Sequence, residues 1–85
     1  MDKKILRLAF GAGGTLKMEN GFLNYQHPYG RTFRVPINDI ETVTIDVKGW
    51  GESNLKIIGR GVELASEKMP ISWAKKCQSW ILENK

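Results

Sequence analysis

Hydrophobic and polar residues alternate along residues 4–64 with a period of two, which is typical of β-strands that have one buried face. The clearest run, residues 42–47, follows a turn indicated by Pro36 and the Asn38-Asp39 pair. Its aliphatic residues alternate with threonine and aspartate, so we expect one face to be buried and the other to lie in water. The aliphatic positions are Val43, Ile45 and Val47.

Turn signals divide the alternating region into seven short strands between about residues 4 and 67. Asn20-Gly21 is the strongest hairpin signal, and glycine clusters indicate turns elsewhere. Residues 48–53 and 59–61 are expected to be loops. The apolar residues assigned to these strands include Leu6, Leu8, Phe10, Leu16, Met18, Phe22, Leu23, Tyr25, Phe33, Val35, Leu55, Ile57, Val62 and Leu64.

The period changes to three and four residues after Pro70, which predicts an amphipathic helix over about residues 71–84. Proline is tolerated at a helix start, and Ser72 is the expected N-cap. A helix of this length is marginal alone in water, so its apolar stripe must dock on the strands. The stripe consists of Trp73, Ala74, Cys77, Trp80, Ile81 and Asn84, and the opposite face carries Lys75, Lys76, Gln78, Ser79 and Glu83.

Short strands with short connections, followed by one helix, predict an α+β, mainly β fold in a single domain over residues 1–85. We expect a seven-stranded antiparallel barrel, or a pair of orthogonal sheets, closed by the C-terminal helix, which plugs the barrel. A small barrel of another kind, such as an oligonucleotide-binding fold, is the alternative. A terminal helix after all the strands fits that alternative poorly.

Two stretches carry a resemblance to a known family: the run from Val35 to Val43, with its proline, isoleucines, polar pairs and closing valine, and Trp80-Ile81-Leu82-Glu83 in the helix. With the strand count, they resemble small bacterial pleckstrin-homology-like (PH-like) domains over nearly the whole chain. The resemblance implies the fold and, because its motifs consist of core and turn residues, it specifies no ligand. Bacterial domains of this kind also assemble with copies of themselves.

The loop between the first two strands departs from one branch of that family. Phosphoinositide-binding members resemble one another in having several basic residues around this loop, where donors converge on phosphate. Here the loop is a glycine cluster at residues 11–14, flanked only by Arg7 and Lys17. The resemblance therefore does not carry inositol-phosphate recognition over to this chain. An ordinary glycine hairpin is the favoured interpretation.

Composition indicates a weak excess of positive charge and favours one cellular location. Thirteen Lys and Arg against nine Asp and Glu give a formal charge of +4, which favours anionic surfaces without identifying one. The N-terminal apolar run is broken by Arg7, so it is too short and too charged for a signal peptide or a membrane span. A single cysteine, Cys77, makes no internal disulfide. Together these features favour a soluble protein in a reducing cytoplasm.

Catalytic constellations are not evident in the sequence. The one histidine, His27, sits in a turn, and Cys77 lies on the apolar stripe of the predicted helix. Neither a nucleophile with its base nor a zinc site can be assembled from them. Asp39 and Glu41 are expected to be solvated, and the glycine cluster lacks the spacing of a nucleotide-binding loop. We therefore expect no enzyme activity, no metal and no cofactor.

Trp50 is the residue most open to a functional interpretation. It lies between two glycines beside Lys48, where an aromatic ring can insert at a membrane interface or anchor a partner. The alternative is that the ring folds back over an open edge of the barrel. Tyr29 also lies in a turn and is equally ambiguous.

Three functional hypotheses remain. The leading one is a non-catalytic interaction module that binds a protein partner, or a second copy of itself, through a sheet edge or groove. The second is peripheral binding to an anionic membrane through Lys48 and Trp50, or through Arg7 and Lys17. The third is single-stranded nucleic-acid binding, with bases stacked on aromatic side chains beside arginines. Its aromatic residues are Tyr25, Tyr29 and Phe33, and the candidate contact residues overall are Lys48, Trp50, Arg7, Lys17, Tyr29, Arg31 and Arg34.

Overall fold

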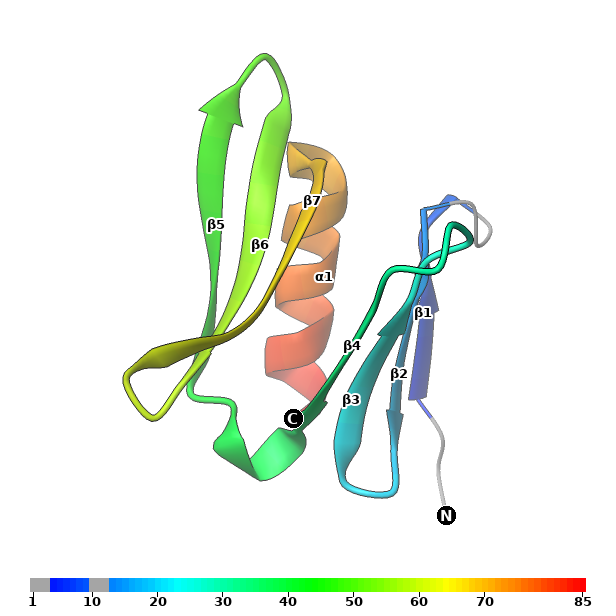
Figure 1. Cartoon of the computed structure of the whole chain (residues 1–85), viewed down its shortest axis with the longest axis vertical. Helices are drawn as coiled ribbons and strands as arrows, with labels where there is room; N and C mark the ends of the chain where they lie inside the picture. The colour runs from blue at the N-terminus through cyan, green and yellow to red at the C-terminus, as the bar shows by residue number, and fades with distance from the viewer. Residues whose placement is uncertain (1–3, 10–12) are drawn as a thin grey trace.

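The structure, a computed structural model, describes residues 4–9 and 13–85 of the chain. Within these residues the backbone forms seven β-strands, a short 3-10 helix (η2) and one α-helix (α1), which confirms the predicted strands and C-terminal helix (Figure 1). The elements are β1 (Lys4–Arg7), β2 (Thr15–Glu19), β3 (Phe22–Gln26), β4 (Thr32–Pro36), η2 (Ile37–Asp39), β5 (Thr42–Gly49), β6 (Glu52–Gly59), β7 (Val62–Pro70) and α1 (Ile71–Asn84).

The strands form two antiparallel sheets, each built from strands that are consecutive in the chain. The first sheet has the order β1-β2-β3-β4 and the second sheet has the order β5-β6-β7, with η2 between them. Helix α1 contacts all three strands of the second sheet and also β1 of the first. In Figure 1 the helix runs between the two sheets, so its apolar stripe closes the core from behind.

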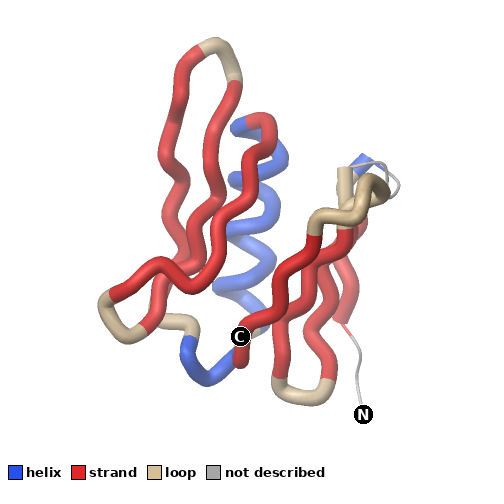
Figure 2. The backbone as a smooth tube through the Cα atoms, in the orientation of Figure 1, coloured by secondary structure: helices blue, strands red, loops and turns tan. Residues whose placement is uncertain are grey.

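The two sheets do not join into a closed barrel. Strands β4 and β7 are outer strands of their sheets and contact each other, but no hydrogen-bonded ladder connects them in the described residues (Figure 2). The prediction of a closed barrel is therefore not confirmed, whereas two packed sheets with one C-terminal helix are present. The alternating pattern determines which face of a strand is buried, but it does not specify whether outer strands pair.

Among the described residues, three hairpins are closed by two-residue turns in which both residues have positive φ. The pairs are Asn20-Gly21 (55° and 83°), Trp50-Gly51 (49° and 81°) and Arg60-Gly61 (54° and 76°). Two positive φ angles define type I′ turns, whose twist matches that of the flanking strands. The Asn20-Gly21 hairpin is thus confirmed. The loop predicted at residues 48–53 is wrong, because β5 continues to Gly49 and β6 begins at Glu52.

The core lies between the two sheets and the helix. Most strand positions expected to be apolar and inward are buried, including Leu16, Met18, Leu23, Val35, Leu55 and Ile57. Leu6, Phe33, Ile45 and Leu64 are partly buried, whereas Val47 and Val62 are each 57% exposed, because they lie near the hairpin turns at opposite ends of the second sheet. Strand β1 ends at Arg7, although Leu8 beyond it is buried. Phe10, also predicted to be in this strand, lies outside the described residues.

Helix α1 starts differently from the prediction. Pro70, the last residue of β7, occupies the N-cap, and Ser72 lies inside the helix without capping it. The strand is also longer than the predicted end near residue 67, so it passes directly into the helix. The buried helix residues are Ala74, Cys77 and Ile81, as the apolar stripe predicted, with Trp73 and Trp80 packed beside them.

One residue of the predicted solvent face is an exception. The side-chain amide of Gln78 is partly buried and donates a hydrogen bond of 2.8 Å to the carbonyl of Val43 in β5. The helix is therefore joined to the second sheet by a polar contact as well as by apolar packing. Lys75 and Ser79 on the same predicted face are exposed, as expected.

Candidate functional site

The β5–β6 turn lies at the top of Figure 1 with the start of α1 beside its hairpin, and the β3–β4 turn lies lower, at the upper end of the first sheet; we call this side of the molecule the tip end. The turns join β3 to β4 and β5 to β6. They carry Tyr29 and Trp50, the two aromatic residues of the described chain with large exposed side chains. The tip end therefore presents the two exposed aromatic side chains to solvent.

Trp50 is fully exposed, with a relative accessibility of 103%. The alternative that its ring folds back over a sheet edge is therefore wrong. Its backbone has φ of 49° and lies between Gly49 at 88° and Gly51 at 81°. Left-handed φ is uncommon for a bulky residue, and type I′ turns favour Asn, Asp or Gly at this position. The hairpin thus holds a large aromatic ring in water at a position where folding alone favours a small residue.

The turn beneath Trp50 is anchored to the rest of the protein. The backbone N–H of Ile71, at the start of α1, donates a hydrogen bond of 2.8 Å to the carbonyl of Gly51. Further down the hairpin, the buried hydroxyl of Ser53 donates to the carbonyl of Met69 at 3.0 Å. These bonds hold the hairpin against β7 and the helix, so Trp50 is presented on a supported element.

The charges near Trp50 compensate one another. The Lys48 ammonium lies 2.9 Å from the Asp46 carboxylate, and the Lys56 ammonium lies 3.6 Å from the same group. The hydrogen bond from Lys48, reinforced by the charge of Lys48 and then of Lys56, lowers the pKa of Asp46. Lys48 is therefore part of an ion-pair network, and Glu52 adds a further negative charge on the other side of the turn.

A hollow of about 240 Å³ lies between the two turns of the tip end. Glu52 and Pro70 line it from the second sheet, and His27 and Arg31 line it from the β3–β4 turn. Gly13 lies against the Trp73 ring, where an added Cβ would overlap the indole. The remaining lining residues are Tyr25, Lys68 and Met69.

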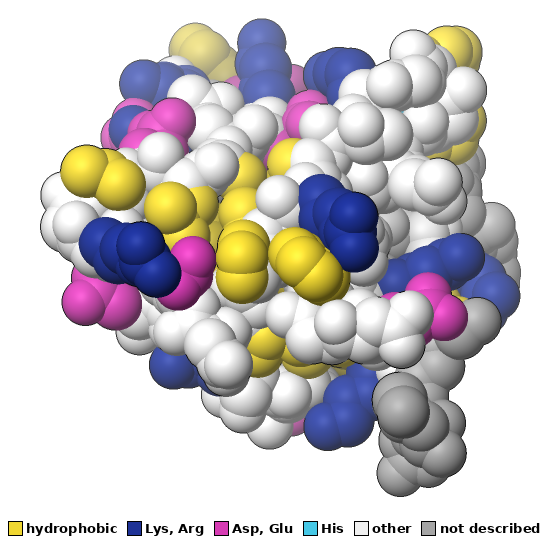
Figure 3. All heavy atoms as spheres, turned by 60° about the horizontal axis from the view of Figure 1, so that its bottom comes forward, with side chains coloured by type: hydrophobic (Ala, Val, Ile, Leu, Met, Phe, Trp, Pro, Cys, Tyr) yellow, Lys and Arg dark blue, Asp and Glu magenta, His cyan; other side chains and the backbone are white. Residues whose placement is uncertain are grey.

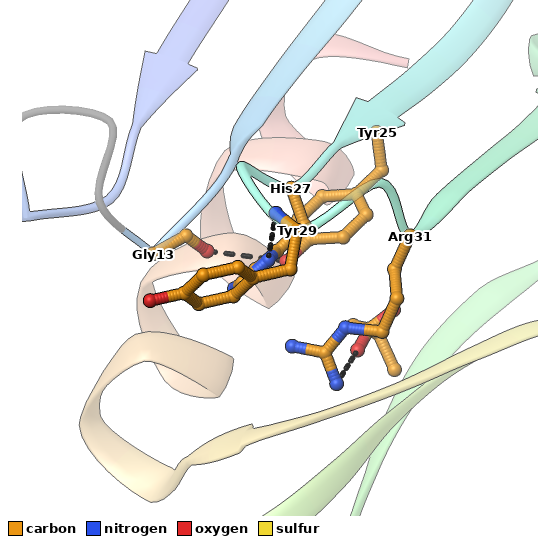
Figure 4. A network of polar contacts seen from close by, with 6 residues as sticks. Gly13, Tyr25, His27, Tyr29 and Arg31 are labelled. Atoms are coloured by element: carbon orange, nitrogen blue, oxygen red, sulfur yellow. Dashed lines mark hydrogen bonds and ion pairs between the residues drawn. The ribbon is translucent and has the colours of Figure 1, made fainter.

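Polar contacts fix the side of the hollow formed by the first sheet (Figure 4). The Tyr25 hydroxyl donates to the carbonyl of Gly13 at 3.1 Å, and Arg31 forms an ion pair of 3.2 Å with the buried Glu67 of β7. Burial raises the pKa of Tyr25 to about 12, and the charge of Glu67 acts in the same direction. Tyr25 is therefore a protonated hydrogen-bond donor at neutral pH.

Tyr29 stands at the outer side of the same turn and is 88% exposed. Its backbone N–H donates to Nδ1 of His27 at 3.1 Å, and the two rings lie with their centroids 5.3 Å apart. The turn is closed by hydrogen bonds between His27 and the backbones of Gly30 and Arg31. His27 is thus used to shape the turn that presents Tyr29.

The seven candidate contact residues do not form one site. Lys48 and Trp50 lie on the β5–β6 hairpin, and Tyr29 and Arg31 lie on the β3–β4 turn. The other three lie on the face of the first sheet that points away from the core. The two residue pairs considered for membrane binding, Lys48 with Trp50 and Arg7 with Lys17, therefore lie on different sheets. The outward-facing residues are Arg7, Lys17 and Arg34.

The stacking row predicted for nucleic acid is wrong as a set. Tyr25 is buried, and Phe33 is partly buried with its ring stacked on Tyr25 at a centroid distance of 5.2 Å. Both rings point inward, away from solvent. Only Tyr29 of the three is exposed.

Glu67 and Trp73 are site residues that sequence reasoning missed. Glu67 shares the inner face of β7 with the buried Met69, two residues further on, so the strand alternation could have revealed it. Trp73, expected in the core, is partly buried against it and also lines the hollow. No sequence signal places it beside Gly13.

Other features of the described residues bear on the remaining predictions. Cys77 is buried, and burial raises the pKa of its thiol to about 12. In the part of the chain that the structure describes, no group of three or more His, Cys, Asp or Glu side chains is placed to hold a metal ion. No described helix has the length and apolar character needed to cross a membrane.

The end opposite the tip end has a different surface. Figure 3 shows it with apolar side chains gathered in its middle and charged side chains of both signs around them.

Comparison of the chain with protein-family models, curated proteins and solved structures finds no match. The function must therefore be argued from the surfaces themselves.

Proposed function

We propose that the protein is a non-catalytic interaction module that binds a partner protein at the tip end, with Trp50 as its anchor. The observation that carries the proposal is a fully exposed indole held in left-handed backbone on a supported turn. Backbone strain of this kind costs roughly 1 to 3 kcal/mol and tends to persist where function requires it. Buried tryptophans are among the side chains that contribute most to protein interfaces.

The partner contributes an apolar pocket for Trp50 and polar groups for the hollow beside it. Arg31 lines the hollow from the first sheet, and Glu52 and Lys68 line it from the second, so both signs of charge are present there. Strand β5, which leads into the Trp50 turn, is an outer strand with no second ladder within the described residues, so an extended segment can pair with its backbone. Affinity then comes from Trp50 and the strand edge, and selection comes from the hollow.

The charge around Trp50 favours a protein over an anionic membrane. Peripheral membrane binding combines an inserted aromatic with uncompensated basic residues near the surface. Lys48 is paired with Asp46, and Glu52 follows within the same hairpin. An anionic bilayer therefore gains little electrostatic attraction at this turn.

The non-catalytic role is supported by the places of the two most reactive side chains. Cys77 is in the core, and His27 binds the backbone of its own turn.

We also propose that the fold is PH-like. The order of the elements, seven antiparallel strands in two sheets followed by one helix, supports this assignment.

The test replaces Trp50 with Asn, which suits the type I′ turn and removes the anchor. Arg60→Asn is the matched control, because Arg60 holds the same turn position in the β6–β7 hairpin. Wild-type and variant proteins serve as baits in lysate of the source organism, and sedimentation measures self-association. We expect a specific partner, or a second copy, that Arg60→Asn retains and Trp50→Asn weakens by about 30-fold or more.

Two results would contradict the proposal. One is a partner or dimer that binds equally well to Trp50→Asn. The other is association of the wild type with phosphatidylserine vesicles, lost in Trp50→Asn, without any Trp50-dependent protein contact. The second result would assign the tip end to a membrane surface.

A further inference from the structure

We infer that the outer face of the first sheet is a second binding surface, and that it takes a single strand of nucleic acid. This surface, which we call the outer face, points away from α1 and the second sheet (Figure 1). It is separate from the tip-end site proposed above. Its side chains follow from the strand registers, because directly paired residues point to the same side of a sheet.

Three rows of paired residues make up the outer face. Their neighbours along each strand, such as Leu16, Leu23 and Val35, are buried and mark the opposite face as the core. The outward rows are therefore the solvent side. They are Arg7-Thr15-Gln26-Thr32, Ile5-Lys17-Asn24-Arg34 and Glu19-Phe22-Pro36.

The net charge of the protein is concentrated in this part of the chain. Residues 1–36 contain six of the thirteen Lys and Arg and two of the nine Asp and Glu, whereas residues 37–85 contain seven of each. The formal charge of +4 therefore belongs to the part of the chain that forms the first sheet. Within the described residues, Arg7, Lys17 and Arg34 form no ion pair, and Glu19 is the one acidic residue of the outer face.

The basic residues are spaced across the sheet. Lys17 and Arg34 share a row two strands apart, which is about 10 Å, and Arg7 lies one row and one strand from Lys17, about 8 Å away. A nucleic acid presents a phosphate at every nucleotide, so a chain crossing the strands meets successive cations. This charge complementarity points to a polyanion.

The groups between the cations favour nucleic acid among polyanions. The Arg34 guanidinium lies over the Phe22 ring at 3.8 Å from its centroid, and the ring is partly exposed. Exposed aromatic and guanidinium planes stack bases. Asn24 and Gln26 lie beside them with amide groups that can hydrogen-bond base edges. These four residues combine stacking with polar recognition.

The shape of the outer face favours a single strand over a duplex. A hollow of about 450 Å³ runs over β2, β3 and β4, and its outward lining includes Lys17, Asn24, Gln26 and Arg34. Unstacked bases can enter such a hollow, whereas base edges in a duplex are reached by an element inserted into a groove. A lipid surface is disfavoured because the outer face lacks a fully exposed aromatic such as Trp50, which lies on the second sheet.

The test measures fluorescence anisotropy of labelled oligouridylate and oligothymidylate of about 12 nucleotides, a length that spans such a surface. The wild type is compared with the double variants Lys17→Gln/Arg34→Gln and Lys75→Gln/Lys76→Gln. Each double variant removes two positive charges, but the second removes them from the exposed side of α1. Thermal unfolding confirms that all three proteins are folded. The two oligonucleotides show whether the surface prefers RNA or DNA.

We expect wild-type binding at about 50 mM salt that weakens at about 150 mM salt. Lys17→Gln/Arg34→Gln is expected to bind the oligonucleotide at least about tenfold more weakly. The slope of log affinity against log salt should become shallower by about 1.4, because two phosphate contacts are removed. Lys75→Gln/Lys76→Gln should stay within about twofold, because its charges are remote from the outer face. Phe22→Leu should weaken oligonucleotide binding several-fold and leave polyphosphate binding unchanged, because only bases stack.

Four outcomes would overturn the inference. They are absence of oligonucleotide binding at low salt, equal losses in the two double variants, polyphosphate binding as tight as oligonucleotide binding, and association of the outer face with acidic vesicles instead. Trp50→Asn is expected to bind oligonucleotide as the wild type does. Failure here and failure of the tip-end proposal are therefore distinguishable.

Discussion

Nη1 of Arg31 lies 3.2 Å from Oε1 of Glu67, and this ion pair connects two sheets that share no ladder in the described residues. Arg31 precedes β4 in the first sheet, and Glu67 lies on β7 of the second. The Glu67 side chain is 9% exposed and that of Arg31 is 52% exposed. The carboxylate is therefore mostly removed from water and depends on a partner that is half solvated.

Loss of Arg31 should destabilise the fold more than loss of Glu67. Arg31→Ala leaves a buried carboxylate without its partner, so we expect the free energy of unfolding to fall by about 1 to 2 kcal/mol. Glu67→Gln keeps the shape, removes the charge and should cost less. Urea unfolding of the single and double variants gives the coupling energy. A coupling near zero would show that the pair does not contribute to holding the sheets together.

Trp50 should be dispensable for stability. Asn is favoured in left-handed backbone, so we expect Trp50→Asn to leave the free energy of unfolding unchanged or to raise it by up to about 1 kcal/mol. Trp80→Ala should lower the free energy of unfolding by about 2 to 3 kcal/mol, because Trp80 is packed beside the core. Differential scanning calorimetry distinguishes the two. The reverse ranking would mean that the exposed indole stabilises the fold.

Alkaline pH should destabilise the fold, because the Cys77 thiol and the Tyr25 hydroxyl are buried in their protonated forms. Burial raises the pKa of Cys77 from 9.0 to about 12, so the folded state keeps a proton that the unfolded state releases. Stability therefore falls as the pH rises above about 9, by up to about 1.4 kcal/mol per pH unit. Tyr25 adds to the loss above its ordinary value of 10.0.

Urea titrations between about pH 7 and pH 10.5 measure this slope. Cys77→Ala is the control, because it should remove the portion of the slope that begins near pH 9. The same burial predicts that a thiol reagent modifies Cys77 only after unfolding. Rapid modification of the native protein at pH 8 would contradict the buried, protonated thiol.

Gly13 should be intolerant of a side chain. Gly13→Ala places its Cβ within the Trp73 ring, so we expect a loss of about 1 to 3 kcal/mol and a change in tryptophan fluorescence. In a Trp73→Leu background the penalty should shrink, because the clash is removed. An equal penalty in both backgrounds would trace the effect to the backbone instead of the indole.

Most strands, turns and the helix of this fold can be predicted from the sequence, whereas the packing of these elements against one another cannot. Leu16, Met18 and Leu23 alternate strictly, and Asn20-Gly21 has the turn chemistry of a hairpin, so local physics determines them. Gln78 was misplaced because its contact with Val43 joins residues far apart in the chain. The unpaired outer strands have the same cause, since pairing between β4 and β7 depends on how the sheets pack.

The candidate sites show the same division. Trp50 was identified from its glycine neighbours, and its full exposure was one of two alternatives that the sequence left open. From sequence alone, Arg7 and Lys17 belong to the membrane hypothesis and Arg34 to the nucleic-acid hypothesis, because Arg34 is distant from the other two in the chain. Only the strand registers place them on one face.

Every ladder in the two sheets joins strands that are neighbours in the chain. Each sheet is therefore a meander that can form through short loop closures, which is the kind of topology associated with rapid folding. The long-range step is the docking of α1, which contacts β1 at the other end of the sequence. The folding barrier is then expected to lie in assembling two nearly self-contained halves around the helix.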